Sequence, residues 1–231
     1  MIAIIRFLKI GTLALSICVL AGLLENQVIR GKPVLATNGV ESFGSSTATS
    51  RYRLDDSQSS FMVRAFSGGL LWFKGHDHLI RARDFSGEAE LTPGTINPAS
   101  LHLTVRAASL EETRDVFTPQ QKQIINKELR DIVLEPDKYP EIVFKSTNVS
   151  GKATGANQYE LKIVGDLTLH GVTRQITIPT MVTINGNDMR AQGEFNIERS
   201  DFSVKATSAL HGTIRVRDKL KFTFDIVGHQ L

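Results

Sequence analysis

The residues with the clearest chemical potential form a short motif, Lys-Gly-His-Asp-His-Leu at residues 74–79, in a chain with only six histidines. Side chains at positions i and i+2 of a β-strand project to the same face, so a strand here would place His76 and His78 side by side and turn Asp77 away. Paired imidazoles suit zinc or copper, but a catalytic zinc needs three protein ligands and an open position. Gly75 also favours a turn or bulge, which would disturb the same-face arrangement.

A third metal ligand is not indicated by any sequence spacing. The candidates are His170, His211, Asp84 and Glu88. We therefore predict no bound metal and no catalytic cofactor. A metal-binding protein or metal-dependent enzyme centred on His76 and His78 remains the alternative.

Acid–base or nucleophilic catalysis has weaker support. A histidine working with a nearby carboxylate needs a substrate and a group that stabilises developing charge, and neither can be named. Ser200, Asp201 and a histidine form a triad only on paper, since the sequence contains no nucleophile elbow. We therefore predict a protein that is not an enzyme.

The elements that must position these residues are predicted by a period of two in the hydrophobic residues from residue 51 onward. Such alternation is typical of strands with one buried and one solvated face. Turn signals separate the runs; they lie at residues 67–69, 92–94, 97–98, 151–157 and 185–188. Roughly eight antiparallel strands without repeated βα units indicate a closed barrel or a sandwich.

One predicted helix interrupts the strands. Thr118 and Gln121 form a capping box around Pro119, and the apolar residues that follow suit an amphipathic helix that ends before Pro136. We interpret this helix as a lid or plug with a solvated outer face.

The N-terminal residues differ from the rest. Basic residues precede an uncharged apolar run at residues 10–24, a pattern typical of a secretory signal and short for a membrane-spanning helix. We predict a signal peptide or an uncleaved membrane anchor at residues 1–36, a flexible linker at 37–50 and the folded body at 51–231. Export is expected in either case.

Composition excludes several functions for the folded body. The one cysteine, Cys18, lies inside the apolar run, so disulfides, thiol catalysis and Cys-based zinc sites are excluded from the exported part. Residues 37–231 contain 23 basic and 23 acidic side chains. A net charge of zero gives no nucleic-acid footprint.

Three stretches carry a family resemblance: Tyr-Pro-Glu-Ile-Val-Phe at residues 139–144, Gly-Asp-Leu-Thr-Leu-His-Gly-Val-Thr-Arg at 165–174 and Glu-Arg-Ser-Asp-Phe at 198–202. In type and order they resemble the YceI-like family, and the resemblance extends from about residue 51 to residue 227. It implies an all-β fold, an eight-stranded antiparallel lipocalin-like barrel that encloses a long apolar chain such as a polyisoprenoid. It also implies export to the bacterial periplasm or cell envelope and no defining catalytic activity.

In such a barrel the inward side chains would contact the expected partner, an amphiphilic lipid. The inward positions include small residues, among them Gly87, Ala89, Ala191 and Gly193, which we interpret as leaving room along the barrel axis. The predicted lipid-binding residues are Phe61, Val63, Phe85, Leu101, Leu103, Phe144, Ile163, Leu167, Ile178, Phe195, Phe222 and Phe224.

A polar head group would need hydrogen-bonding groups where the barrel opens. The candidates are His76, His78 and Arg81. The alternative to a lipid carrier is a packed barrel that acts as an interaction module in the envelope.

Overall fold

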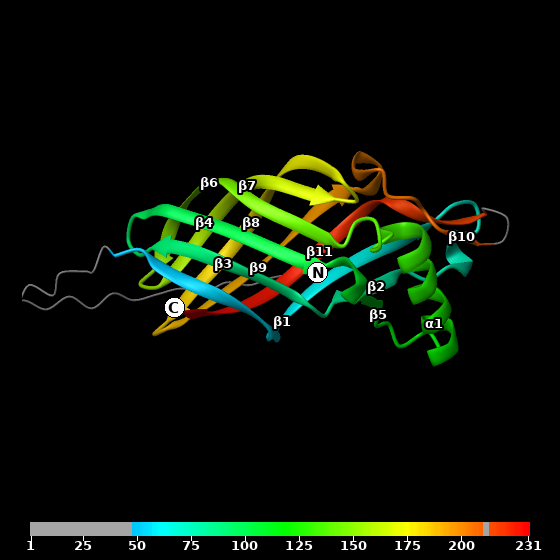
Figure 1. Ribbon diagram of the computed structural model, residues 1–231, viewed down its shortest axis with the longest axis horizontal. Coiled ribbons are helices and arrows are strands. Elements are labelled where there is room, and N and C mark those ends of the chain that lie inside the picture. Colours follow the sequence, from blue (N-terminus) through cyan, green and yellow to red (C-terminus); the bar gives the residue numbers. More distant parts are fainter. Residues whose placement is uncertain (1–47, 210–212) are drawn as a thin grey trace, which may run out of the picture. The chain divides into compact units, whose positions relative to one another are not determined.

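Eight strands pair in a ring and form a closed antiparallel barrel in the computed structural model, which describes residues 48–209 and 213–231 (Figure 1). Their order is β11-β9-β8-β7-β6-β4-β3-β1, and β1 pairs with β11 to close the ring. The strands are β1 (Ser50–Gly68), β3 (Phe85–Thr92), β4 (Ile96–Arg106), β6 (Glu141–Gly155), β7 (Gln158–Leu169), β8 (Val172–Asn185), β9 (Asp188–Glu198) and β11 (Ile214–Gln230). The predicted eight-stranded barrel is confirmed, and the sandwich is excluded.

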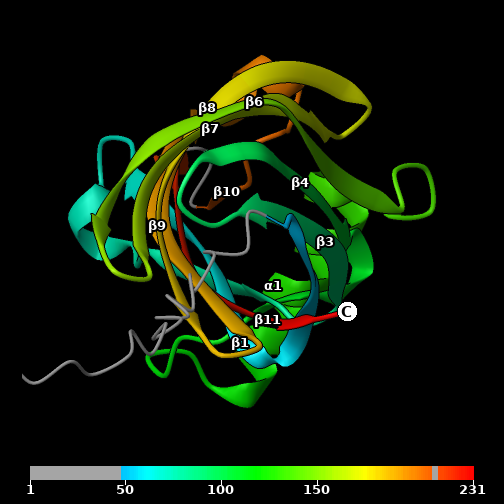
Figure 2. The same ribbon diagram turned by 90° about the vertical axis from the view of Figure 1, so that its left-hand side faces the viewer.

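Three short strands extend the ring at the end where β1 finishes and β11 begins, which we call the mouth end. β2 (His78–Ala82) pairs with the second half of β1 and with β5 (Leu110–Glu112). β10 (Ser208–Ala209) pairs with the start of β11. Figure 2 views the barrel from the opposite end.

One α-helix lies at the mouth end. α1 (Pro119–Glu128) begins with the predicted capping box, in which the Gln121 N–H donates to Thr118 Oγ1 (3.3 Å) and the Thr118 N–H donates to Gln121 Oε1 (2.8 Å). The chain continues into a wider turn, η3 (Leu129–Leu134), and leaves the helix before Pro136 as predicted. Shorter helical turns occupy three other connections: η1 (Trp72–Lys74), η2 (Ala107–Ser109) and η4 (Arg199–Phe202).

No helix among the described residues is long and apolar enough to cross a membrane. The predicted signal or anchor at residues 1–36 and the first part of the predicted linker, residues 37–47, lie outside the described residues. The first strand begins at Ser50.

The predicted alternation of buried and exposed residues is confirmed along the strands. In β7 the odd-numbered positions from Tyr159 to Leu169 are buried, and the charged residues between them are exposed. One predicted turn is wrong, because residues 97–98 belong to β4. The turn predicted at 151–157 is present but shorter, at residues 156–157, since β6 continues to Gly155 and pairs with the first residue of β7, Gln158.

Candidate ligand-binding cavity and its mouth

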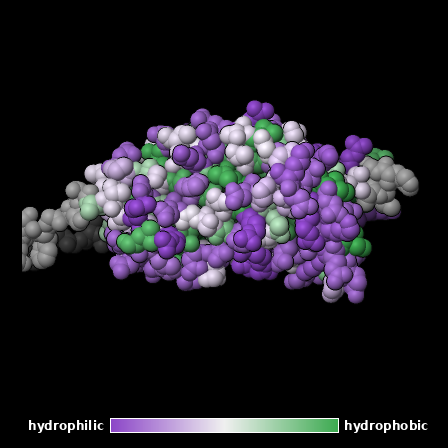
Figure 3. All heavy atoms as spheres, viewed as in Figure 1, coloured by the Kyte–Doolittle hydropathy of each residue, from purple (hydrophilic) through white to green (hydrophobic). Residues whose placement is uncertain are grey.

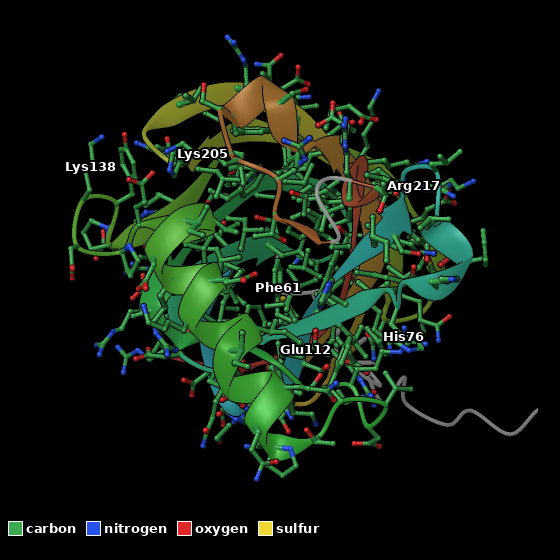
Figure 4. All side chains as sticks on the ribbon, turned by 90° about the vertical axis from the view of Figure 1, so that its right-hand side faces the viewer. Phe61, His76, Glu112, Lys138, Lys205 and Arg217 are labelled. Atoms are coloured by element: carbon green, nitrogen blue, oxygen red, sulfur yellow. The ribbon has the colours of Figure 1, made fainter. Side chains whose placement is uncertain are left out.

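A cavity of about 520 Å³ lies inside the barrel, a volume within the range of small-molecule sites. Inward-facing apolar side chains of the strands form most of its wall. The lining also includes Ile124 of α1, whose side chain is 61% exposed, so the cavity reaches solvent beside the helix. Figure 4 looks toward this end of the barrel, with Phe61 seen inside the ring of strands.

Eleven of the twelve residues predicted to contact a lipid line this cavity: Phe61, Val63, Leu101, Leu103, Phe144, Ile163, Leu167, Ile178, Phe195, Phe222 and Phe224. Phe85 differs from the prediction. It is buried and packs its ring against Phe61, with the centroids 6.4 Å apart, but it is not among the lining residues. Phe85 therefore supports the cavity wall rather than forming it.

Aromatic rings cover one side of the cavity across three adjacent strands. Phe195 of β9 stacks on Phe222 of β11, with centroids 4.8 Å apart and planes 11° apart. Phe61 of β1 meets Phe222 edge-on at 6.1 Å. This packing gives a wall with large apolar area and little conformational freedom.

The small inward residues divide into two groups. Ala89 and Ala191 line the cavity, as expected of residues that leave room for a ligand. The two glycines do not. A Cβ on Gly193 would lie 2.7 Å from Cζ of Phe224, and one on Gly87 would lie 3.0 Å from Cδ1 of Leu54. The space above each glycine is filled by a neighbouring side chain, so that part of the prediction is wrong.

At the mouth, both histidines of the motif line the cavity and both contact Phe117. The ring of His78 stacks on Phe117 with centroids 5.3 Å apart, and the ring of His76 meets it edge-on at 5.8 Å. Only His78 belongs to a strand, since β2 begins there. The two imidazoles therefore lie together because of Phe117 and not because of strand alternation.

Asp77 points away from the two histidines and fixes the backbone beside them. Its carboxylate accepts hydrogen bonds from Arg64 Nη2 (2.7 Å) and from the N–H of Ser67 (2.9 Å). Burial raises the pKa of Asp77, but these two donors outweigh it and hold the pKa below its ordinary value.

His78 has a carboxylate partner that the sequence did not indicate. Its Nδ1 lies 2.8 Å from Oε2 of Glu112, whose side chain is fully buried. Glu112 also accepts hydrogen bonds from the N–H groups of Arg114 (2.8 Å) and Leu79 (3.2 Å). Burial raises the pKa of Glu112, but the hydrogen bonds from His78 and the two N–H groups outweigh it and lower the pKa. Glu112 is therefore ionised at neutral pH, and because a carboxylate can only accept, Nδ1–H of His78 donates the hydrogen bond to it.

Arg81, the third head-group candidate, also differs from the prediction. Its neighbour Ile80 lines the cavity, whereas Arg81 does not, because successive side chains of β2 face opposite sides. Arg81 Nη2 donates to the carbonyl oxygen of Ser59 (3.2 Å) instead.

The residues considered as a third metal ligand are engaged elsewhere. Asp84 pairs with Arg106, Glu88 with Arg51 and His170 with Glu135. His211 lies outside the described residues. In the part of the chain that the structure describes, no three His, Cys, Asp or Glu side chains are grouped as a metal site would require.

Sequence reasoning missed Phe117 but not α1, which was interpreted as a lid or plug of the barrel. Ile124 and Ile125 line the cavity with Gln121 and Phe117, so the helix forms part of the rim.

Comparison with known proteins agrees with the barrel. Residues 52–228, which reach from β1 to β11, match the YceI-like domain. Protein YceI of Escherichia coli O6:H1 is 31% identical over 174 residues, which cover 71% of this chain and 81% of that protein.

Two solved structures share the fold. Burkholderia cenocepacia BcnA superimposes with a TM-score of 0.59 at 22% identity, covering 75% of this chain and 98% of that one. A polyisoprenoid binding domain from Saccharophagus degradans superimposes with a TM-score of 0.54 at 15% identity, covering 78% of this chain and 98% of that one. At these identities both structures show likeness of fold alone. The family match covers most of the chain, and the chain therefore belongs to the YceI-like family.

Proposed function

We propose that this protein binds an amphiphilic lipid with an isoprenoid-type chain and keeps that chain out of water. The observation that carries the proposal is the cavity of about 520 Å³ with its apolar wall of inward strand residues. Each methylene group transferred from water to such a wall contributes about 0.8 kcal/mol, so affinity can arise without specific polar contacts along the chain.

The head group of this lipid would lie at the mouth, against His76 and His78. Because the ionised Glu112 holds the proton on Nδ1 of His78, the second ring nitrogen of His78 is left for the ligand. A neutral imidazole accepts a hydrogen bond from a hydroxyl group, and a protonated one donates to a phosphate. The mouth therefore suits an alcohol or phosphate head group.

The fold relative from Saccharophagus degradans, described as a polyisoprenoid binding domain, supports the choice of an isoprenoid chain over other lipids. We further propose that the protein acts after export, in the periplasm or cell envelope. The apolar run at residues 10–24 behind a basic start supports this location.

The proposed activity is binding without chemistry. Ser200, the serine considered for a triad, donates its hydroxyl to Asp218 Oδ2 (2.5 Å) and not to a histidine.

Displacement of a fluorescent apolar probe tests the proposal. Geraniol, farnesol and geranylgeraniol carry the same head group on chains of increasing length. We expect each added isoprene unit to displace the probe at a lower concentration, until the chain exceeds the cavity. Equal displacement by all three alcohols, or none, would contradict binding of the chain inside the barrel.

A further inference from the structure

The loop between β1 and β2 exposes large apolar side chains at the mouth end. Residues 70–73 read Leu-Leu-Trp-Phe, and the side chains of Leu70 and Phe73 are 80% and 64% exposed. A run of four apolar residues in an exposed loop is unfavourable for a soluble surface unless it serves a contact.

The conformation of this loop is fixed by hydrogen bonds at its base. The N–H of Leu71 donates to the carbonyl of Thr213 (3.0 Å), and the N–H of Lys74 donates to the carbonyl of Leu71 (2.9 Å). Gly69 has a φ of +87°, and a Cβ there would lie 2.5 Å from the carbonyl oxygen of Thr213. The loop therefore presents Leu70 and Phe73 in a defined, tightly anchored turn.

The surroundings of the loop are basic, although residues 37–231 as a whole have a net charge of zero. Lys74 belongs to the loop, and Arg215 and Arg217 lie at its base, where a Cβ on Gly69 would be 3.4 Å from the N atom of Arg215 and one on Gly68 would be 2.8 Å from Cγ of Arg217. Residues 107–140, which include α1, contain five basic and seven acidic residues, a net charge of −2. The charge is thus divided between the two sides of the mouth.

The basic, apolar side adjoins the cavity opening. His76, at the end of the loop, lines the cavity together with Arg215. In Figure 4 His76 and Arg217 lie on one side of the mouth end and Lys138 on the other. Figure 3 shows hydrophobic residues interrupting the hydrophilic surface at the right-hand end, where the mouth lies.

We propose that the β1–β2 loop is a membrane-docking element that inserts Leu70 and Phe73 into an anionic bilayer while the surrounding Lys and Arg contact its head groups. Apolar side chains beside basic ones are the combination that binds interfacially to anionic lipid. Docking in this orientation places the cavity opening at the bilayer surface. The proposal does not depend on which lipid the cavity holds.

The chain provides its own reporter, since its one tryptophan is Trp72 in this loop. The full chain is mixed with vesicles of phosphatidylcholine and phosphatidylglycerol whose acyl chains carry bromine, which quenches tryptophan on contact. We expect quenching with these vesicles and much less with brominated phosphatidylcholine alone. Whatever residues 10–24 do at the bilayer, the quenched residue is at position 72.

Matched variants assign the contact. Leu70→Ser with Phe73→Ser should remove most of the quenching, whereas Met181→Ser with Val116→Ser, at exposed apolar positions outside the loop, should leave it unchanged. Lys74→Gln should weaken the apparent affinity for anionic vesicles roughly fivefold, the effect of one basic residue near such a surface. Thermal melting confirms that each variant is folded.

Three results would overturn the proposal. One is an unquenched wild-type Trp72, and another is equal quenching by anionic and zwitterionic vesicles. The third is a Trp72 emission shift that depends on protein concentration without vesicles, which would assign the loop to contact with a second copy of the chain.

Discussion

Nδ1 of His78 lies 2.8 Å from Oε2 of Glu112, and this pair ties the first residue of β2 to the last residue of β5 at the cavity mouth. The carboxylate is fully buried, yet its pKa is lowered, because His78 and the N–H groups of Arg114 and Leu79 all donate to it. A buried carboxylate with these partners holds Nδ1 of His78 and leaves the other ring nitrogen for the cavity.

Glu112→Gln should destabilise the protein by about 2 kcal/mol at neutral pH, because it removes a charged acceptor from buried donors. A group with a lowered pKa stabilises the fold above its ordinary value of 4.5 and loses that contribution as the pH falls through the folded value. The difference in the free energy of unfolding between wild type and variant, measured by urea unfolding, should therefore become smaller in acid.

Glu111→Gln is the matched control for this experiment. Glu111 pairs with Arg83, and both side chains are about half exposed, so loss of the pair should change the free energy of unfolding by less than about 1 kcal/mol. Equal effects of the two substitutions would show that Glu112 has no special structural role.

His229 should make stability depend on pH near neutrality. A hydrogen bond with Asp188 of β9, and a second one with Asp55 of β1, raise the pKa of His229 above its ordinary value of 6.5. The basic residue Arg53 also faces His229, since the two are register partners in the β1–β11 pair. A group with a raised pKa stabilises the fold below its ordinary value of 6.5, and this stabilisation is lost as the pH rises through the pKa of the folded state. His229→Gln should flatten the decline of the melting temperature across that range, and an unchanged slope would contradict this assignment.

Gly165→Ala tests the close packing of glycine against aromatic rings. An added Cβ would lie 2.5 Å from Cζ of Phe144 and 2.5 Å from the carbonyl oxygen of Lys145. Overpacking of this kind costs about 1–3 kcal/mol. Gly155→Ala, where the nearest atom is 3.4 Å away, should stay within about 0.5 kcal/mol in the same urea titration. A neutral Gly165→Ala would contradict close packing at this position, because both the ring of Phe144 and the backbone at Lys145 would have to move without cost.

Ala191→Phe should abolish ligand uptake with little loss of stability. Ala191 lines the cavity opposite Val182 and Ile226 in the strand register, so a phenyl ring can enter existing space. We expect at least roughly tenfold weaker probe binding, as several buried methylene contacts are lost, and a destabilisation below about 1 kcal/mol. Ser150→Phe, on the exposed face of β6 opposite the exposed Lys162, is the control. Severe destabilisation by Ala191→Phe alone would favour a packed barrel.

The barrel was predictable because alternation of buried and solvated residues is a local property of each strand. The spacing of Tyr159, Leu161 and Ile163 predicts the inner face of β7, whichever strands pair with it. The length of the β6–β7 hairpin was not predictable, since Gly151 reads as a turn residue. Pairing with β7 keeps it in a strand.

The site was predictable only where it follows from the same alternation. Phe195 and Phe222 face inward on their own strands, as alternation predicts. Whether an inward glycine leaves space depends on the neighbouring strand, and the ring of Phe224 fills the space above Gly193. The contacts of His78 with Glu112 and Phe117 join residues more than thirty positions apart. No spacing in the sequence encodes such contacts.

Native mass spectrometry of the protein purified gently from its source, followed by organic extraction, tests the central claim most directly. The proposal of a lipid-filled barrel predicts one lipid adduct per chain, with an extracted isoprenoid-type chain, and loss of this adduct in Ala191→Phe but not in Ser150→Phe. A ligand-free mass in repeated preparations of the wild-type protein would contradict it.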